Sequence, residues 1–122
     1  PILKNKLYKS EKMTKKNTKL QVNLALNYGS KYELVDALKI LNKKKKKISI
    51  KNIENCLYTA EIPDPDILIR TGDTKRLSNF MLWQLAYSEI YFEKKLWPDF
   101  NEKDFLKIIQ QFKKTKRNYG NI

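Results

Sequence analysis

Short apolar stretches alternate along the chain between helical and extended spacing. In residues 2–13 apolar side chains recur near every third or fourth position with lysines between them, which predicts an amphipathic helix. Residues 20–28 partly alternate and become apolar on both sides at Ala25, which favours a strand in a mostly covered sheet. After a break at Gly29 and Ser30, a second helix is predicted, and it ends in the lysine run 43–47. The apolar positions of this helix are Tyr32, Val35, Leu38, Ile40 and Leu41.

The middle of the chain changes to extended structure. Ser49 is placed to cap a short helix that runs on through Ile53 and Leu57. Two prolines within residues 62–65 exclude a helix there, because each removes a backbone donor and favours extended backbone. Residues 67–69 form a continuous β-prone apolar run, which indicates a buried parallel strand.

A polar loop, residues 70–76, follows this strand and leads to the last elements. Ser78 or Asn79 can cap a helix that carries the apolar residues between 80 and 87, and residues 90–92 fit a short strand. A turn at residues 97–98 precedes a final helix capped by Asn101. The predicted buried face of that helix is Phe105, Ile108, Ile109 and Phe112.

The order of these elements predicts an α/β fold, layered, with a central and mainly parallel sheet flanked by helices. We expect residues 1–122 to belong to one domain, since no internal repeat or flexible linker is visible. The first residue is Pro1 rather than methionine, which fits a fragment or a processed product.

Composition excludes several classes of protein. The apolar runs are far shorter than the ~20 residues of a membrane span, and no secretion signal opens the chain. Cys56 is the single cysteine and there is no histidine, so a disulfide framework and the usual zinc or Cys–His sites are excluded. We expect a cytoplasmic protein.

The formal net charge of +13 first suggests a nucleic-acid-binding domain. However, residues 1–55 hold 15 lysines against four acidic residues, whereas residues 56–122 hold 11 basic and nine acidic residues. The aromatic side chains cluster in this second, nearly neutral half, and not among the lysines as a nucleic-acid module would need. The lysine run 43–47 is therefore interpreted as a solvated helix end and loop, with a binding patch as the alternative.

The three arginines are more informative than the lysines, because a guanidinium binds carboxylate or phosphate as a rigid fork. Arg70 stands where the predicted strand ends, the edge at which α/β sheets bind ligands. Arg76 and Ser78 follow, and Gly72 lets the backbone approach a ligand closely. Together they predict a site for a multiply charged anion such as a diphosphate. The alternative is that the arginines form surface ion pairs with Asp64, Asp66 or Asp73.

Glu89 follows the aromatic segment and is a candidate Mg²⁺ ligand, since Mg²⁺ takes one or two carboxylates together with phosphate oxygens. The alternative for Glu89 is a solvated acid at a helix end. Trp83, Tyr87 and Trp97 are interpreted as core residues rather than a ligand platform.

Three segments resemble the C-terminal signature of the cis-prenyltransferases, the family of undecaprenyl diphosphate synthase. They are Ile67-Leu-Ile-Arg-Thr-Gly72, Arg76-Leu-Ser-Asn-Phe-Met-Leu-Trp-Gln-Leu-Ala-Tyr-Ser-Glu-Ile-Tyr-Phe92 and Leu96-Trp-Pro-Asp-Phe100. Asn23 to Gly29 and Tyr32 to Asp36 resemble the preceding strand and helix of the family. The resemblance covers almost the whole chain as the C-terminal half of a single domain.

The resemblance implies an enzyme that lengthens a prenyl chain. Arg70, Arg76 and Ser78 would bind the diphosphate of isopentenyl diphosphate, and Glu89 would bind Mg²⁺. The other substrate is an allylic diphosphate, which ionises and is attacked by C4 of isopentenyl diphosphate before a proton is lost. The product would be a long cis-polyprenyl diphosphate of the undecaprenyl type, the precursor of a cell-wall lipid carrier. A homodimer is implied, with peripheral contact to the inner face of the membrane through the lipid product and no nucleic-acid partner.

The chain departs from the family pattern at several points. Asp73 stands where a second glycine is usual, and Asn118 stands where an arginine of the C-terminal Arg-x-Gly motif is expected, so that Arg117 is a possible substitute. The N-terminal motif whose aspartate binds Mg²⁺ on the allylic diphosphate does not occur in this sequence. We therefore expect this chain alone to be inactive. The competing functions are a non-catalytic accessory subunit and a basic nucleic-acid-binding domain.

Overall fold

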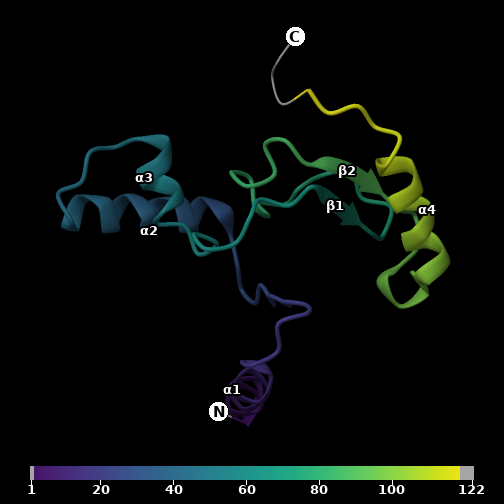
Figure 1. Ribbon diagram of the computed structural model, residues 1–122, viewed down its shortest axis with the longest axis horizontal. Helices are drawn as coiled ribbons and strands as arrows, with labels where there is room; N and C mark the ends of the chain where they lie inside the picture. The colour runs from purple at the N-terminus through teal and green to yellow at the C-terminus, as the bar shows by residue number, and fades with distance from the viewer. Residues whose placement is uncertain (1, 119–122) are drawn as a thin grey trace.

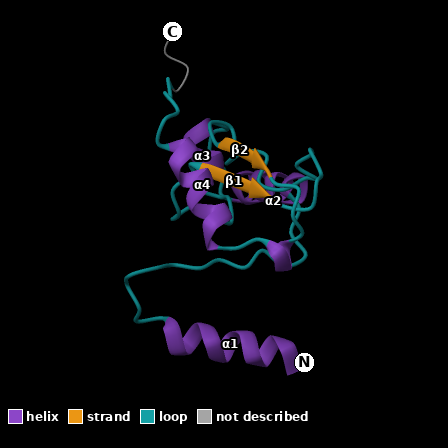
Figure 2. Cartoon of the chain, turned by 90° about the vertical axis from the view of Figure 1, so that its right-hand side faces the viewer, coloured by secondary structure: helices purple, strands orange, loops and turns teal. Residues whose placement is uncertain are grey.

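The computed structural model describes residues 2–118. Its elements in chain order are helix α1 (Ile2–Thr14), helix α2 (Ser30–Lys43), helix α3 (Ile50–Glu54), strand β1 (Ile67–Arg70), strand β2 (Glu89–Phe92), a 3₁₀ turn η1 (Trp97–Asp99) and helix α4 (Glu102–Phe112). In Figure 1, β1 and β2 lie between α2 and α3 on one side and α4 on the other. Helix α1 stands apart and is joined to the rest only by an extended segment, as Figure 2 also shows.

The two strands pair in parallel, as the sequence predicted, with Ile67 opposite Glu89 and Arg70 opposite Phe92. All four residues of β1 are half-buried rather than fully buried. Within residues 2–118 the sheet has two strands, so β1 is paired along one edge only.

The prediction that residues 20–28 form a strand of this sheet is wrong. The segment is extended but is not assigned to any ladder. Its side chains Leu20, Val22, Leu24 and Leu26 are between 62% and 77% exposed. A strand needs a neighbour for its backbone groups, and among the residues described this segment has none.

The predicted helix at residues 80–87 is also wrong. The segment is a series of turns in which Ser78, Asn79 and Met81 adopt positive φ values of 50°, 64° and 45°. A right-handed helix requires negative φ in its interior, so Met81, which would lie in the first turn, interrupts the predicted helix. Apolar composition predicted the helix, and the local backbone excludes it.

Helix α2 forms where predicted, but it buries a different face. Its buried residues are Ser30, Glu33, Ala37 and Leu41. The predicted apolar positions Tyr32, Val35 and Leu38 are instead exposed, by 78%, 47% and 43%. The buried stripe therefore follows a spacing of three or four residues and includes a carboxylate; of the predicted apolar positions only Leu41 belongs to it, and the others are not buried by the described residues.

The caps of α3 and α4 are confirmed. Ser49 accepts a hydrogen bond from Asn52 N at 3.3 Å, which begins α3. Asn101 caps α4 in a reciprocal arrangement with Asp104, whose carboxylate accepts from Asn101 N at 3.0 Å. Of the predicted buried face of α4, Ile108 is buried, whereas Phe105 is 45% exposed.

The buried apolar core is small for the size of the chain. Its members among the described residues are Ala37, Leu41, Leu57, Leu85 and Ile108. The solvent-accessible surface is 10980 Å², whereas a compact monomer of this mass exposes only about 6,900 Å². Among the described residues the exposed side chains include many large apolar ones, such as Leu20, Val22 and Leu24.

Candidate functional site: an arginine-lined pocket at the end of strand β1

The loop after β1 is held against the segment that follows β2. Glu93 N donates to Arg70 O at 2.8 Å, Asp73 N donates to Glu93 O at 3.1 Å, and Gly72 N donates to Lys95 O at 2.8 Å. Gly72 and Asp73 both have positive φ, of 90° and 52°. The loop therefore turns sharply as it leaves the strand, at a position where glycine is favoured and Asp73 is the exception.

Arg70 and Ser78 come together, as the sequence predicted. The Arg70 Nη1 group donates to the Ser78 hydroxyl at 3.2 Å and also to the main-chain carbonyl of Arg76. Arg76 thus contributes its backbone to the cluster, while its side chain is exposed to solvent. Arg70 is the last residue of β1, whereas Arg76 and Ser78 lie in the segment that follows it, so the observed contacts unite two of the three predicted side chains.

Neither Arg70 nor Arg76 forms an ion pair with a carboxylate in the part of the chain described. The ion pairs found there are Lys39–Asp36, Lys95–Asp104 and Arg117–Asp66. The alternative that Arg70 and Arg76 merely pair with nearby aspartates is therefore not what the structure shows. Asp73, which lies in the same loop, is exposed to water.

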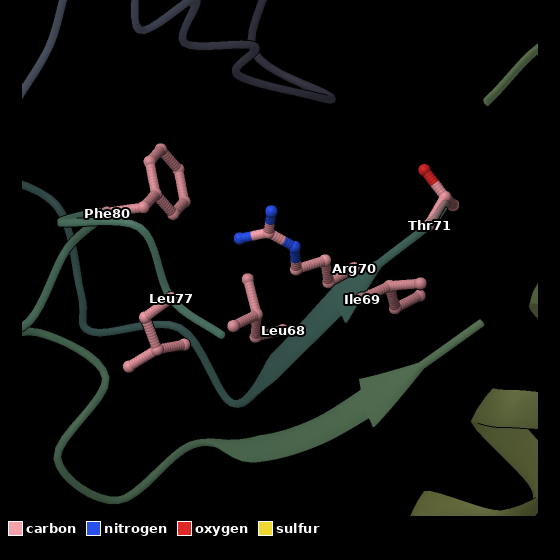
Figure 3. Close-up of a pocket in the computed structure, with 6 residues that line it drawn as sticks. All are labelled: Leu68, Ile69, Arg70, Thr71, Leu77 and Phe80. Atoms are coloured by element: carbon pink, nitrogen blue, oxygen red, sulfur yellow. The ribbon is translucent and has the colours of Figure 1, made fainter. Parts of the chain in front are cut away.

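A pocket of about 360 Å³ opens beside Arg70. Its lining residues are Leu68, Ile69, Arg70, Thr71, Leu77 and Phe80. Figure 3 shows the Arg70 guanidinium projecting from the strand into the space between Leu68 and Phe80. A cation set in an otherwise mainly apolar wall suits a ligand with a charged head and a hydrocarbon body.

Glu89 lies elsewhere. It begins β2 opposite Ile67, three positions before the pair Arg70–Phe92, so about 10 Å of strand separates it from Arg70 at roughly 3.3 Å per residue. It lines a second hollow of about 310 Å³. The structure does not bring Glu89 to the arginine cluster within this chain.

The second hollow also contains the C-terminal residues that the sequence singled out. Its lining residues are Tyr87, Ser88, Glu89, Lys116, Arg117 and Asn118. Arg117 pairs with Asp66, donates to the Tyr87 carbonyl at 3.0 Å and lies 5.5 Å from the centre of the Phe112 ring. Arg117 is therefore engaged in holding the C-terminal segment against the strand pair.

The described residues do not complete a magnesium site by themselves. Residues 2–118 hold no group of three or more acidic, cysteine or histidine side chains that could surround a metal ion. Glu89 offers one carboxylate, with Lys116 and Arg117 nearby. A Mg²⁺ ion at Glu89 would take its other ligands from diphosphate oxygens, water or residues outside this chain.

A buried carboxylate network surrounds Glu33 on α2, and the sequence analysis missed it. Glu33 is 0% exposed and accepts hydrogen bonds from Tyr28 OH, from Tyr58 N at 2.8 Å and from Gln84 Nε2 at 3.1 Å. Burial and the hydrogen bond to Glu33 raise the pKa of Tyr28 to about 12, so its hydroxyl stays a donor. The spacing of Glu33, Ala37 and Leu41, four residues apart, was the available signal for this face.

A parallel strand pair flanked by helices, with the Arg70 guanidinium in a mainly apolar pocket at the strand end, defines a protein of the α/β class. Comparison with known proteins identifies the family within this class. A family model described as "Putative undecaprenyl diphosphate synthase" matches residues 1–120. The chain belongs to this family.

Two relatives with similar sequences support this assignment to the family. The chain is 44% identical over 119 residues to an isoprenyl transferase of Rickettsia prowazekii, covering 97% of this chain and 53% of the relative. It is 43% identical over 117 residues to an isoprenyl transferase of Thermotoga maritima, covering 92% of this chain and 50% of the relative. The chain thus spans about half the length of these relatives.

The structural matches confirm the layered α/β fold. A probable undecaprenyl diphosphate synthase from Campylobacter jejuni superposes with a TM-score of 0.86 at 37% identity, covering 98% of this chain and 56% of that one. Lavandulyl diphosphate synthase from Lavandula x intermedia, solved in complex with dimethylallyl diphosphate, gives a TM-score of 0.90 at 32% identity, covering 98% and 54%. In the described part of the chain, no helix is both long and apolar enough to cross a bilayer.

Proposed function

We propose that this chain supplies the isopentenyl diphosphate-binding side of a prenyltransferase. The enzyme would condense isopentenyl diphosphate with an allylic diphosphate and so extend a cis-polyprenyl diphosphate of the undecaprenyl type. The observation that carries the proposal is the meeting of Arg70 and Ser78 beside a mainly apolar pocket, with neither Arg70 nor Arg76 paired to a carboxylate within residues 2–118.

The pocket's chemistry supports this assignment. A guanidinium and a hydroxyl at the pocket rim suit diphosphate oxygens, because charge-assisted hydrogen bonds to phosphate are strong and directional. The leucine, isoleucine and phenylalanine wall suits a short isoprenoid body. Bound in this way, the nucleophilic substrate would be held in a fixed orientation, which is the main contribution that a protein makes to joining two reactants.

We propose that Glu89 binds Mg²⁺, and that its carboxylate shares the ion with diphosphate oxygens. The ion would neutralise charge on a diphosphate group. Glu89 and Arg70 lie at different ends of the strand pair, so we assign them to different groups of the complete site. The homodimer and the contact with the membrane surface stay predictions from the resemblance.

We also propose that this chain is inactive when it stands alone. The relatives are about twice as long, and among the described residues the apolar side chains of segment 20–26 are exposed and β1 is paired along one edge only. The excess surface of about 4,000 Å² exceeds what a standard protein–protein interface buries. Purified chain should give no prenyl transfer, and measurable incorporation of labelled isopentenyl diphosphate by it would refute this part of the proposal.

The decisive test joins this chain to the part of the Rickettsia prowazekii relative that it does not cover; we call the product the fusion protein. In the fusion protein, Arg70→Ala should raise KM for isopentenyl diphosphate about 10- to 100-fold, the loss expected for one charged hydrogen-bonding partner. Arg70→Lys should recover little, because an ammonium group lacks the fork of a guanidinium. The matched control is Lys51→Ala, an exposed cation on α3.

An unchanged KM for isopentenyl diphosphate in Arg70→Ala would remove the role assigned to the pocket. A fusion protein that folds but makes no product would favour the competing function, a non-catalytic subunit. The allylic substrate serves as an internal control, since its KM should change little in the Arg70 variants.

A further inference from the structure

The N-terminus of α2 is capped by a residue from a distant part of the chain. Its own N-cap residue, Gly29, provides no side-chain hydrogen bond. Instead, Ser30 N donates to the Asn79 carbonyl at 2.8 Å and Lys31 N donates to Asn79 Oδ1 at 2.9 Å. Asn79 thus satisfies two of the free N–H groups that begin the helix, from 48 residues away along the sequence.

A second contact fastens the same loop to the same helix. The hydroxyl of Ser30, which is fully buried, accepts a hydrogen bond from Leu82 N at 3.0 Å. The loop segment 79–82 is therefore anchored at both of its ends to the first turn of α2. Anchoring of this kind is what holds unfavourable backbone conformations in place.

Residues with positive φ lie in the anchored segment and directly before it. Ser78, Asn79 and Met81 have positive φ, which costs energy for residues other than glycine, least for asparagine. Ser78 directly precedes Asn79, and its hydroxyl meets Arg70 at 3.2 Å. The orientation of the Ser78 hydroxyl thus depends on a left-handed turn that the contact with α2 maintains.

Gly29 makes this contact possible. A Cβ atom at this position would lie 2.8 Å from Asn79 Nδ2, closer than such atoms approach in proteins. The φ of Gly29 is −153°, a value that any residue can adopt. Gly29 is therefore needed for space rather than for backbone freedom, and the side chain that requires the space is that of Asn79.

We propose that Asn79 is a positioning residue for the pocket: by capping α2 it fixes the turn that places the Ser78 hydroxyl beside the Arg70 guanidinium. The inference rests on the proposed function, because it names the group that prepares the isopentenyl diphosphate side of the same site. Asn79 itself lies outside the residues that line the pocket. Its action is through Ser78.

The test uses the fusion protein and measures kcat and both KM values. Asn79→Ala should raise KM for isopentenyl diphosphate about fivefold to tenfold, since substrate then binds a smaller population of correctly formed loop. KM for the allylic substrate should stay the same. Asn79→Asp keeps the acceptor oxygen and tolerates positive φ, so it should return KM to within about twofold of wild type.

Gly29→Ala tests the contact from the other side. It should raise KM as Asn79→Ala does, and the double variant should be no worse than the worse single variant, because both changes break one interaction. Asn42→Ala, an exposed position on the same helix, is the matched control and should change neither KM.

A purely structural role gives a different pattern. Partial unfolding lowers the amount of active enzyme, so it lowers apparent kcat and the melting temperature while KM stays constant. That result for Asn79→Ala, or additive effects in the double variant, would overturn the inference. If Arg70→Ala raises KM and Asn79→Ala does not, only this inference fails; if neither raises it, the proposed function fails as well.

Discussion

Replacing the buried carboxylate of Glu33 should be among the most damaging single changes in this chain. Glu33 is 0% exposed and accepts hydrogen bonds from Tyr28, Tyr58 N and Gln84. Those donors come from the segment before α2, from the turn after α3 and from the turns before β2. One side chain therefore ties together three segments that are up to 51 residues apart.

The magnitude follows from what Glu33→Ala leaves behind. Gln84 is 1% exposed, and its amide nitrogen would lose one of two acceptors, the other being Thr59 Oγ1 at 3.0 Å. The Tyr58 N–H would lose its acceptor as well. An unsatisfied buried donor costs about 1–3 kcal/mol, so the loss of the network together with the cavity amounts to about 3 kcal/mol.

The assay is urea unfolding of the fusion protein, followed by tryptophan fluorescence. Glu33→Gln keeps one acceptor oxygen and should lose about 1–2 kcal/mol, less than Glu33→Ala. Glu61→Ala removes an exposed carboxylate and should leave the free energy of unfolding within about 0.5 kcal/mol of wild type. Equal values for Glu33→Ala and Glu61→Ala would refute the reasoning, since they would mean that the network contributes nothing.

Two further predictions concern groups around the site. The pKa of Tyr28 is raised from 10.0 to about 12, so its protonated form adds stability in full below pH 10 and loses it as pH rises toward 12. The difference in stability between wild type and Tyr28→Phe should therefore shrink across this interval in pH-dependent unfolding curves, and a constant difference would contradict it. Asp73→Asn removes an exposed negative charge from the loop between Arg70 and Arg76 and should lower KM for isopentenyl diphosphate about twofold. Added salt of about 0.5 M should abolish that difference, and a difference that survives salt would exclude an electrostatic cause.

The sequence was sufficient wherever a local signal determines the structure. The caps at Ser49 and Asn101 were predicted because a short polar side chain before a helix satisfies N–H groups only two or three residues away. Strand β1 and the position of Arg70 at its end were predicted because a short β-prone apolar run followed by a polar loop is also a local pattern.

The predictions that failed depended on contacts between distant residues. The apolar run after Asn79 has helical composition, yet Asn79 turns left-handed to cap α2, which no spacing within the run reveals. The face of α2 was misjudged because the prediction followed apolar side chains only, whereas the buried Glu33 has hydrogen-bonding partners that lie 25 and 51 residues away as well as the nearby Tyr28. Polar contacts between distant residues thus decided both cases against the hydrophobic pattern.

The prediction of a strand at residues 20–28 failed for a different reason. Its alternating apolar side chains are what a covered sheet requires, and they are present but uncovered. The hydrogen bonds that involve Arg70, Ser78 and Asn79, in contrast, all form between residues that the structure describes. Contacts between the described residues therefore determine the loop around Arg70, whereas the apolar side chains of residues 20–26 have no covering partner among residues 2–118.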